Sequence, residues 1–354
     1  MRHPLTVVSA GLVSAVGLSA PQTCAAIRAG IADFAETGYY FESPPFEPII
    51  GARVPVPGNS FDENPEIERL AILAGLALSE CLEGLEIDCS RTALLMGVRE
   101  PYRENADLDG REKQLFHKVE QSLGLRFHSE SRLLPEGNAS VLRGVRIAEQ
   151  LLDTNAVTMC IVGGVDSHLN PFDLDRGERT FRILGPVVSR GFVPGEAAGF
   201  VAVTRWNSSS SRSALCRLLG IGLEREKADA LVTSFGYPTG VGLCRALDAA
   251  VKDASIQESR VQFRLSDLNG ESYRGVESML AEARFYRTRR ETLPIWHPAD
   301  CVGETGAAVG AILLIVAAYG LTKGYAPGDL AMCEASSDTG LRAGCVVSTL
   351  ANAP

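Results

Sequence analysis

The sequence lacks the features that mark metal sites, nucleotide-binding sites and disulfide-bonded secreted proteins. Its nine cysteines are scattered, and none falls in a Cys-x-x-Cys or Cys/His cluster. An odd number at irregular spacing predicts reduced, mostly buried thiols in a cytoplasmic protein. The five histidines share no metal-ligand spacing, and neither a phosphate-binding loop nor a G-x-G-x-x-G motif is present. We therefore expect no metal and no cofactor.

Long apolar runs and concentrated charge are also scarce. The formal net charge of −9 is spread without long runs, which argues against nucleic acid or an anionic membrane as the main partner. The apolar run 307–320 is shorter than the roughly 20 residues of a membrane span, so a buried helix is predicted there. The segment 1–21 imitates a secretory signal. A helical pattern continues through 20–31, however, which favours a strand over Leu5–Ala10 and a helix that begins near Pro21.

Apolar strands alternate with helices along the 354 residues. Helical periodicity is clear in four segments, which are Glu66–Cys81, Ser140–Leu152, Leu243–Ala254 and Gly306–Leu321. Short apolar runs lie at 92–98, 157–164, 199–206, 261–268 and 331–336. This alternation predicts an α/β fold with largely parallel strands.

The second half of the chain repeats the first in outline. The helix–strand pattern of 66–98 returns at 243–268, and the elbow, helix and strand of 136–164 return at 302–336. The polar stretch "NSSSSRS" (207–213) is interpreted as a linker. We therefore expect an N-terminal half at 1–206 and a C-terminal half at 214–354. Their central helices should face each other across one cleft.

The stretch "EGNASVLRG" (136–144) has the form of an elbow that turns the chain into a helix. Asn138 is predicted to cap that helix, because the Asn side chain accepts a hydrogen bond from an orphan backbone N–H. The free N–H groups of the elbow would also suit an anion. Asn138 could bind but not attack, since an amide is a poor nucleophile. Ser140 would need an adjacent base, and none is visible in the sequence.

Three other polar positions lie where α/β proteins place sites, although each also has a simple structural explanation. Asn269 in "DLNGES" (267–272) follows a strand. Glu304 in "DCVGETG" (300–306) starts an apolar helix, whose dipole favours a carboxylate. Glu196 lies between small residues in "GFVPGEAAG" (191–199), which suits a tight turn against the core.

Four segments, in the right order along the chain, resemble the β-ketoacyl-ACP synthases and, more broadly, the thiolase-like superfamily. They are the opening strand and helix, "NASVLRGVRIAEQLLDTNAVTMCIVGGVDS", "RGFVPGEAAGFVAV" and "VGETGAAVGAILLIVAAY". The resemblance implies a thiolase-like α/β fold, in which two duplicated βαβαβ-type halves form five layers around central buried helices. It also implies cap insertions at about 50–65 and 170–190 that are shorter than usual. Residues 99–135 match least.

The resemblance places three replaced residues at the family's catalytic positions. The cysteine that forms the acyl thioester falls at Asn138, and the two histidines fall at Asn269 and Glu304. The glycine- and phenylalanine-rich loop near the C-terminus is reduced to "SSDTGLRAG" (336–344), which retains Gly340 and Gly344. Condensation then lacks its nucleophile, and an ionised Glu304 would repel an enolate.

The favoured interpretation is a catalytically inactive, cytoplasmic ketosynthase-like scaffold. Its expected partner is an identical chain or another thiolase-like protein, as in chain-length-factor subunits. A related version is an adaptor for a secreted effector, because degenerate thiolase-like proteins also occur in type VI secretion clusters.

Two alternatives remain open at this point. One is an enzyme with altered acyl-transfer or hydrolytic chemistry, in which Glu304 acts as a general base beside Asn138 and Asn269. The other is a module that binds an acyl chain or an acyl carrier protein without turnover.

Overall fold

The structure is a computed structural model, and it describes residues 4–56, 66–101, 108–206, 214–226 and 237–351. The first half contains β1 (Leu5–Val13), α1 (Ala20–Ala29), β2 (Ala35–Tyr40), β3 (Pro48–Gly51), α2 (Glu66–Leu82), β4 (Thr92–Gly97), α3 (Leu108–Leu123), β5 (Arg132–Leu134), α4 (Ser140–Asp153), β6 (Met159–Ser167), α5 (Pro171–Arg179) and β7 (Glu196–Arg205). The second contains β8 (Cys216–Arg225), α6 (Val241–Asp253), β9 (Phe263–Ser266), α7 (Ser272–Phe285), β10 (Ile295–Trp296), α8 (Ala299–Val302), α9 (Val309–Thr322), β11 (Leu330–Ser336) and β12 (Leu341–Ser348). The predicted linker 207–213 lies outside the described residues.

The ten-stranded sheet confirms the duplication. Its order is β10-β9-β11-β12-β8-β1-β7-β6-β4-β5, so the series outward from β8 repeats the series outward from β1. In both series the first two pairings are antiparallel and the last two are parallel. The two series meet where β1 pairs with β8 over only three residues, Leu5–Val7. Each half is therefore the same five-stranded unit.

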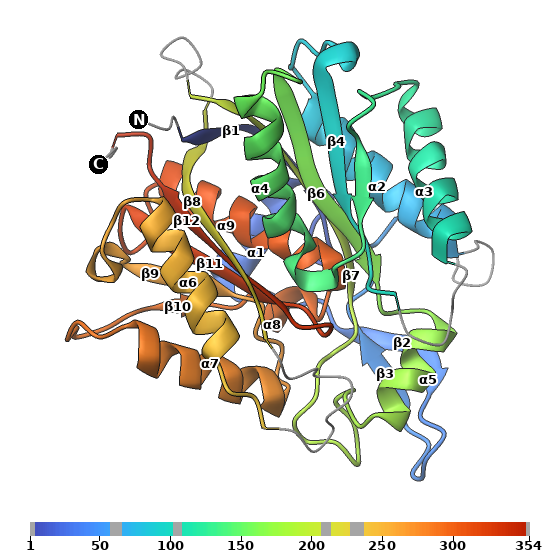
Figure 1. Ribbon diagram of the computed structural model, residues 1–354. Helices are drawn as coiled ribbons and strands as arrows, with labels where there is room; N and C mark the ends of the chain where they lie inside the picture. Colours follow the sequence, from blue (N-terminus) through green and yellow to red (C-terminus); the bar gives the residue numbers. More distant parts are fainter. Residues whose placement is uncertain (1–3, 57–65, 102–107, 207–213, 227–236, 352–354) are drawn as a thin grey trace.

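Helices arrange these strands into five layers (Figure 1). The outer helices α2 and α3 cover one face of the first half, and α6 and α7 cover the corresponding face of the second. Between the halves lie α4 and α9, which contact each other and strands of both series. Twelve of the 14 residues of α9 are buried, as the apolar run predicted. No helix among the described residues is long and apolar enough to cross a membrane.

The prediction of largely parallel strands was wrong. Only the four pairings at the two ends of the sheet, which involve β4 and β9, are parallel. The short turn at 337–340 joins β11 to β12, and so short a connection can only join antiparallel strands. The strand predicted over Leu5–Ala10 is confirmed and runs on to Val13, and α1 begins at Ala20, close to the predicted Pro21.

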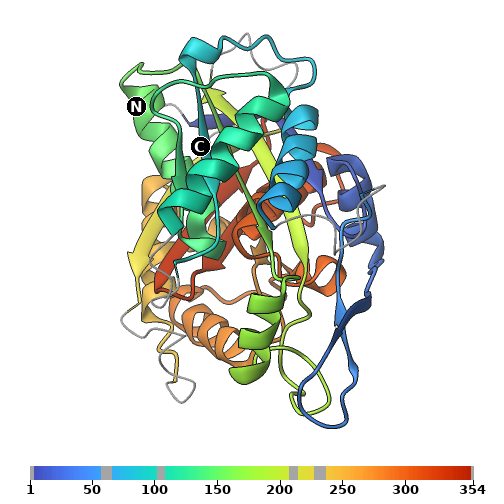
Figure 2. The same cartoon turned by 90° about the vertical axis from the view of Figure 1, so that its right-hand side faces the viewer.

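A small lobe stands beside this layered body. The hairpin of β2 and β3 lies against α5 and the segment 180–192, and together we call these elements the apolar lobe. Its own core consists of Phe41, Ile49, Leu174, Ile183 and Phe192. The Glu178 carboxylate accepts hydrogen bonds from the backbone N–H groups of Glu42 and Ser43, which ties α5 to the hairpin. Figure 2 shows the hairpin projecting from the body beside α5.

Candidate functional site

The elbow forms as predicted, but Asn138 does not cap the helix. A 3₁₀ turn at Gly137–Ala139 leads directly into α4, whose N-cap residue is Ala139 and has no side-chain cap. Gly137 has φ 55°, and a Cβ there would lie 2.7 Å from the Glu100 carboxylate, so only glycine fits. Asn138 is 6% exposed. Its amide points across the interface between the halves instead of back onto its own helix.

Asn138, Asn269 and Glu304, the three positions that the resemblance aligns with catalytic residues, lie together. Asn138 Nδ2 donates to Glu304 Oε1 at 3.2 Å, and Asn269 Nδ2 donates to Glu304 Oε2 at 2.5 Å. The Glu304 carboxylate, in a residue only 5% exposed, also accepts the Gly306 N–H at 2.8 Å. Three N–H donors therefore hold both oxygens of one buried carboxylate at the start of the turn that leads into α9.

Asp267 extends this group. Its Oδ2 accepts from Asn138 Nδ2 at 3.3 Å, from Arg274 Nη1 at 2.9 Å and from the Ser336 N–H at 2.8 Å. Burial raises the pKa of Asp267 to about 7 against the opposing influence of Arg274, while the nearby Glu304 carboxylate adds to the rise. Asp267 can therefore exchange a proton near neutral pH.

Two arginines connect the group to three further segments. Arg274, on α7, reaches Glu271 and Asp338 as well as Asp267. Arg182 bridges Glu271 (Nε–Oε1 2.6 Å) and Asp338 (Nη1–Oδ2 2.6 Å). Burial alone would raise the pKa values of Glu271 and Asp338, but Arg182 and Arg274 outweigh it and lower both. These two carboxylates remain ionised.

Glu100 closes the network at the tip of the β11–β12 hairpin. Its oxygens accept the backbone N–H groups of Asp338 (2.8 Å) and Thr339 (2.7 Å). Burial raises the pKa of Glu100 to about 7, and the neighbouring Asp338 carboxylate adds to the rise. We call the whole set the cleft network; its members are Glu100, Asn138, Arg182, Asp267, Asn269, Glu271, Arg274, Glu304 and Asp338.

Acidic side chains outnumber basic side chains in the cleft network. Five carboxylates face two guanidinium groups, and no thiol or hydroxyl of the network lies at the elbow. A developing oxyanion needs donors that are still free, but the donors nearest Glu304 are already used by its carboxylate. No group of metal-binding side chains is found among the described residues.

The other predicted site residues lie outside the network. Ser140 Oγ is buried and lies 2.1 Å from the position that a Cβ on Gly97 would take. Glu196 begins β7 instead of lying in a turn, and it forms a buried ion pair with Arg69 of α2. Gly340, with φ 97°, is in the hairpin turn.

The segment 336–344, which was predicted to be a loop, is partly strand, and Gly344 shows this. It lies inside β12, where it pairs with Glu334 on one side and Gly222 on the other. A Cβ at this position would come within 3.1 Å of Leu247, so close packing explains the glycine.

Most of the charged members of the network were missed from the sequence. Asp267 and Glu271 lie within the quoted "DLNGES" segment, and Asp338 lies within the quoted "SSDTGLRAG" segment. Arg182 and Arg274 come from segments with no motif. For Asp267 the sequence did offer a signal, because this carboxylate comes at the end of the predicted strand, where α/β proteins place sites. The arginines carry no such signal, because their contacts span up to 156 positions in sequence.

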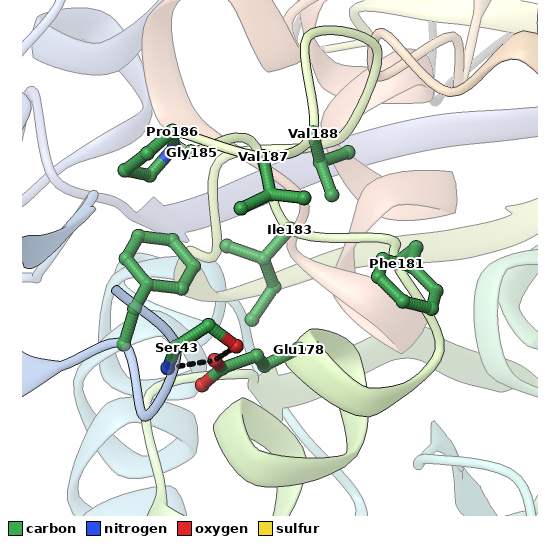
Figure 3. Close-up of a pocket in the computed structure, with 9 residues that line it drawn as sticks. Ser43, Glu178, Phe181, Ile183, Gly185, Pro186, Val187 and Val188 are labelled. Atoms are coloured by element: carbon green, nitrogen blue, oxygen red, sulfur yellow. Dashed lines mark hydrogen bonds between the residues drawn. The ribbon is translucent and has the colours of Figure 1, made fainter. Parts of the chain in front are cut away.

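A separate hollow lies in the apolar lobe (Figure 3). Its volume is about 30 Å³. Phe41 from the hairpin is among its lining residues. Figure 3 shows Ile183 and Val187, from the segment after α5, above the Ser43–Glu178 hydrogen bond. This is the region where the resemblance implies a shortened cap at 170–190.

Comparisons with known proteins establish the fold. No protein-family model matches the chain, and no curated protein sequence does. A chain of the AntDE:AntF structure, a type II polyketide synthase acyl carrier protein in complex with its ketosynthase bound to the hexaketide, aligns with a TM-score of 0.79 and 16% identity, over 99% of this chain and 100% of that one. The ishigamide ketosynthase/chain length factor aligns with a TM-score of 0.77 and 16% identity over the same shares. A β-ketoacyl synthase from Burkholderia phymatum STM815 gives 0.74 and 16%, over 98% and 100%. The chain therefore has the thiolase-like ketosynthase fold.

Proposed function

We propose that this protein is a catalytically inactive ketosynthase-like subunit that acts by binding another protein. The observation that carries the proposal is the Glu304 carboxylate, which is held by Asn138, Asn269 and the Gly306 N–H at the elbow. In an active ketosynthase-like site these positions would supply a nucleophile and donors. Here they supply two amides and one carboxylate, whose hydrogen bonds satisfy each other.

Glu304 is also a poor candidate for a general base in an altered reaction. Its two oxygens are occupied by three donors, so it would have to lose one of them before it could approach a substrate proton. Asn138 and Glu304 are almost fully buried. The polar groups therefore stabilise the junction between the two halves.

The apolar lobe supports a role in protein binding. Large apolar side chains are exposed on the hairpin and on the α5 segment; they are Tyr40, Phe46, Ile50, Phe172, Phe181, Leu184 and Val187. Single exposed apolar residues are ordinary, but such a concentration around a hollow is typical of an interaction site.

Two of these residues have a positive φ, a backbone conformation that side chains other than glycine and asparagine rarely adopt. Phe46 has φ 59° and Phe181 has φ 56°, a region in which glycine or asparagine is favoured over a bulky residue. Their side chains are 59% and 68% exposed, so burial within this chain does not offset the strain. A contact with another molecule would explain both residues.

The proposed partner is a second thiolase-fold chain, in a homodimer or a heterodimer. The similar structures include a ketosynthase/chain length factor and a ketosynthase bound to an acyl carrier protein. The second candidate partner, by analogy with type VI secretion clusters, is a secreted effector that the subunit loads or stabilises. The third candidate partner is an acyl carrier protein.

Size-exclusion chromatography with light scattering tests the proposal. The full chain is measured alone and after co-expression with each thiolase-like, effector or acyl-carrier protein encoded beside it. We expect a mass of two thiolase-fold chains, which Phe181→Asp and Val187→Asp reduce to one. Met279→Asp, which changes an equally exposed residue of α7, is the matched control and should leave the complex intact. A strict monomer that captures none of these proteins would refute the scaffold.

An activity assay separates this proposal from altered chemistry. Incubation with acyl-pantetheine should give neither a covalent acyl-enzyme nor hydrolysis above that of buffer. Hydrolysis that disappears in Glu304→Gln would overturn inactivity and assign Glu304 as a general base.

A further inference from the structure

The outer layer of the second half carries a groove with a concentration of positive charge. It lies between α6, the segment 256–259 and the C-terminal end of α7, and it has a volume of about 550 Å³. Its cationic lining residues are Arg245, Lys252, Arg284 and Arg287. The segment "RFYRTRR" (284–290) adds Arg289 and Arg290 at one end. We call this the basic groove, and it stands out on a chain with a formal net charge of −9.

The carboxylates in the basic groove are committed to two of its cations. Asp248 pairs with Lys252 (Oδ2–Nζ 2.5 Å), and Glu258 pairs with Arg290. Glu258 also accepts the Thr288 N–H at 2.8 Å. Thr288 and Arg290 outweigh burial and lower the pKa of Glu258, so its charge is fully developed and locally balanced.

The arginines are not balanced in this way. Arg284 donates to the backbone carbonyl oxygens of Thr239 and Leu280, and Arg287 donates to that of residue 284. Within the described segments, neither these two side chains nor Arg245 and Arg289 forms an ion pair. All four are exposed. The groove therefore presents unneutralised guanidinium groups, whose planar donor pairs match carboxylates.

The floor of the basic groove is apolar. Val251 and Phe285 are buried beneath it, and Ile256 and Cys244 are partly exposed at its surface. An apolar floor between guanidinium groups suits an amphipathic helix or strand that carries carboxylates on one side. It offers little to a phosphodiester backbone, and the acidic remainder of the chain would repel a long polyanion.

We propose that the basic groove docks an acidic, amphipathic segment of a partner protein. Carboxylates of that segment would pair with Arg245, Arg287 and Arg289, and an apolar side chain would rest on Ile256. Figure 1 shows α6 and α7 at the left of the molecule and the apolar lobe at the right. The segment would therefore occupy a different surface from the lobe, and the chain could hold two partners at once. This inference does not depend on what the lobe binds.

Cysteine footprinting on the full chain tests the proposal. Cys244 lines the groove, and Cys89 is the other cysteine that is not buried, so Cys89 serves as an internal reference. The probe is a synthetic helical peptide of about 20 residues, with glutamates along one face and leucines along the other. We expect the peptide to slow iodoacetamide alkylation of Cys244 several-fold and to leave Cys89 unchanged. About 0.5 M NaCl should remove the protection because it screens exposed charge.

Charge-reversed variants locate the binding. Arg245→Glu/Arg287→Glu/Arg289→Glu should weaken peptide affinity at least about tenfold and abolish protection of Cys244. Lys113→Glu/Arg126→Glu/Lys323→Glu makes the same change in net charge at exposed positions elsewhere, and should bind like the unmodified chain. Equal losses in both variants would overturn the site, because binding would then follow net charge alone.

Two further probes distinguish the chemistry. Ile256→Ser should weaken the amphipathic peptide while a glutamate–serine peptide of equal charge is unaffected; equal effects would refute docking on the apolar floor. A single-stranded DNA of equal charge should not protect Cys244. Protection by DNA as strong as by peptide would assign the groove to phosphates instead, and no binding of the peptide would refute the proposal outright.

Discussion

The cleft network and the apolar lobe reverse the usual distribution of side chains in a folded protein. In the cleft, carboxylates and arginines are buried between the two halves of the fold. In the lobe, Phe46, Phe172 and Phe181 are exposed to solvent, as is Val187. Burying charge and exposing apolar surface both cost free energy unless something compensates. In the cleft the compensation is visible within the chain; for the lobe it would have to come from another molecule.

Arg182 belongs to both regions. It lies in the segment that follows α5, and its guanidinium reaches across to Glu271 and Asp338. It also lies over the ring of Phe192 in the lobe core, at 5.6 Å from the ring centroid. Through Arg182 the cleft network is therefore bonded to the lobe whose surface we propose binds a partner.

Removal of Arg274 from the cleft network should have the largest effect on the free energy of unfolding. Arg274→Met leaves Asp267 without a cationic partner and leaves Glu271 and Asp338 with Arg182 alone. We therefore expect the free energy of unfolding to fall by about 3–5 kcal/mol. Urea denaturation measures the change. Arg284→Met, on the same helix but exposed, is the control and should change stability by less than about 0.5 kcal/mol. A similar small loss in both variants would show that the network contributes little.

The protonation of Asp267 and Glu100 should make the stability of the cleft depend on pH. Burial raises both pKa values to about 7 from ordinary values of 3.8 and 4.5, so the folded chain holds protons that the unfolded chain releases. The free energy of unfolding should therefore be higher at pH 5 and fall as the pH rises through 7, by on the order of 1–3 kcal/mol. Glu271 and Asp338, whose pKa values are lowered, stay ionised across this window and contribute no slope.

The matched variant for this titration is Asp267→Asn/Glu100→Gln. Its denaturation profile between pH 5 and 8 should be distinctly flatter than that of the unmodified chain. Profiles that run parallel would show that other buried carboxyl groups, such as Asp166 with its raised pKa, carry the dependence.

Much of the fold could be predicted from sequence, whereas only part of the site could. The apolar run of α9 and the repeated elbow–helix–strand pattern are local signals, and they predicted the duplicated halves and the meeting of Asn138 with Glu304. The alternation pattern failed to identify β12, because "LRAGCVVS" is buried on both faces and shows no period of two. The arginines of the cleft could not be found, since an ion pair between distant segments leaves no local pattern.

Replacement of Phe181 tests whether the exposed side chains of the apolar lobe contribute to the stability of this chain, and the expected effect is smaller. Phe181→Gly relieves a positive φ, so the free energy of unfolding should stay level or rise by up to about 1 kcal/mol, while partner association weakens. Phe172→Gly is the control, because Phe172 is also exposed on the lobe but lies within α5. That change should lower stability by about 0.5–1 kcal/mol, the cost of glycine in a helix. If both variants lose stability alike, the Phe181 ring is held by this chain and not reserved for a partner.

The smallest effect on the free energy of unfolding is expected at the elbow, where a serine that only packs can be compared with a serine that forms hydrogen bonds. Ser140 Oγ is buried against Gly97 and has no hydrogen-bond partner in the part of the chain that the structure describes. Ser337 Oγ, by contrast, accepts the Ala139 N–H at 3.1 Å and donates to the carbonyl oxygen of Glu136. Ser140→Ala should therefore change the free energy of unfolding by less than about 0.5 kcal/mol, whereas Ser337→Ala should lower it by about 1–2 kcal/mol. Thermal and urea denaturation of the pair decide the point. A loss for Ser140→Ala as large as that for Ser337→Ala would mean that the hydroxyl at the start of α4 makes a polar contact, and the elbow would then be less completely satisfied than the amide–carboxylate contacts of Asn138 indicate.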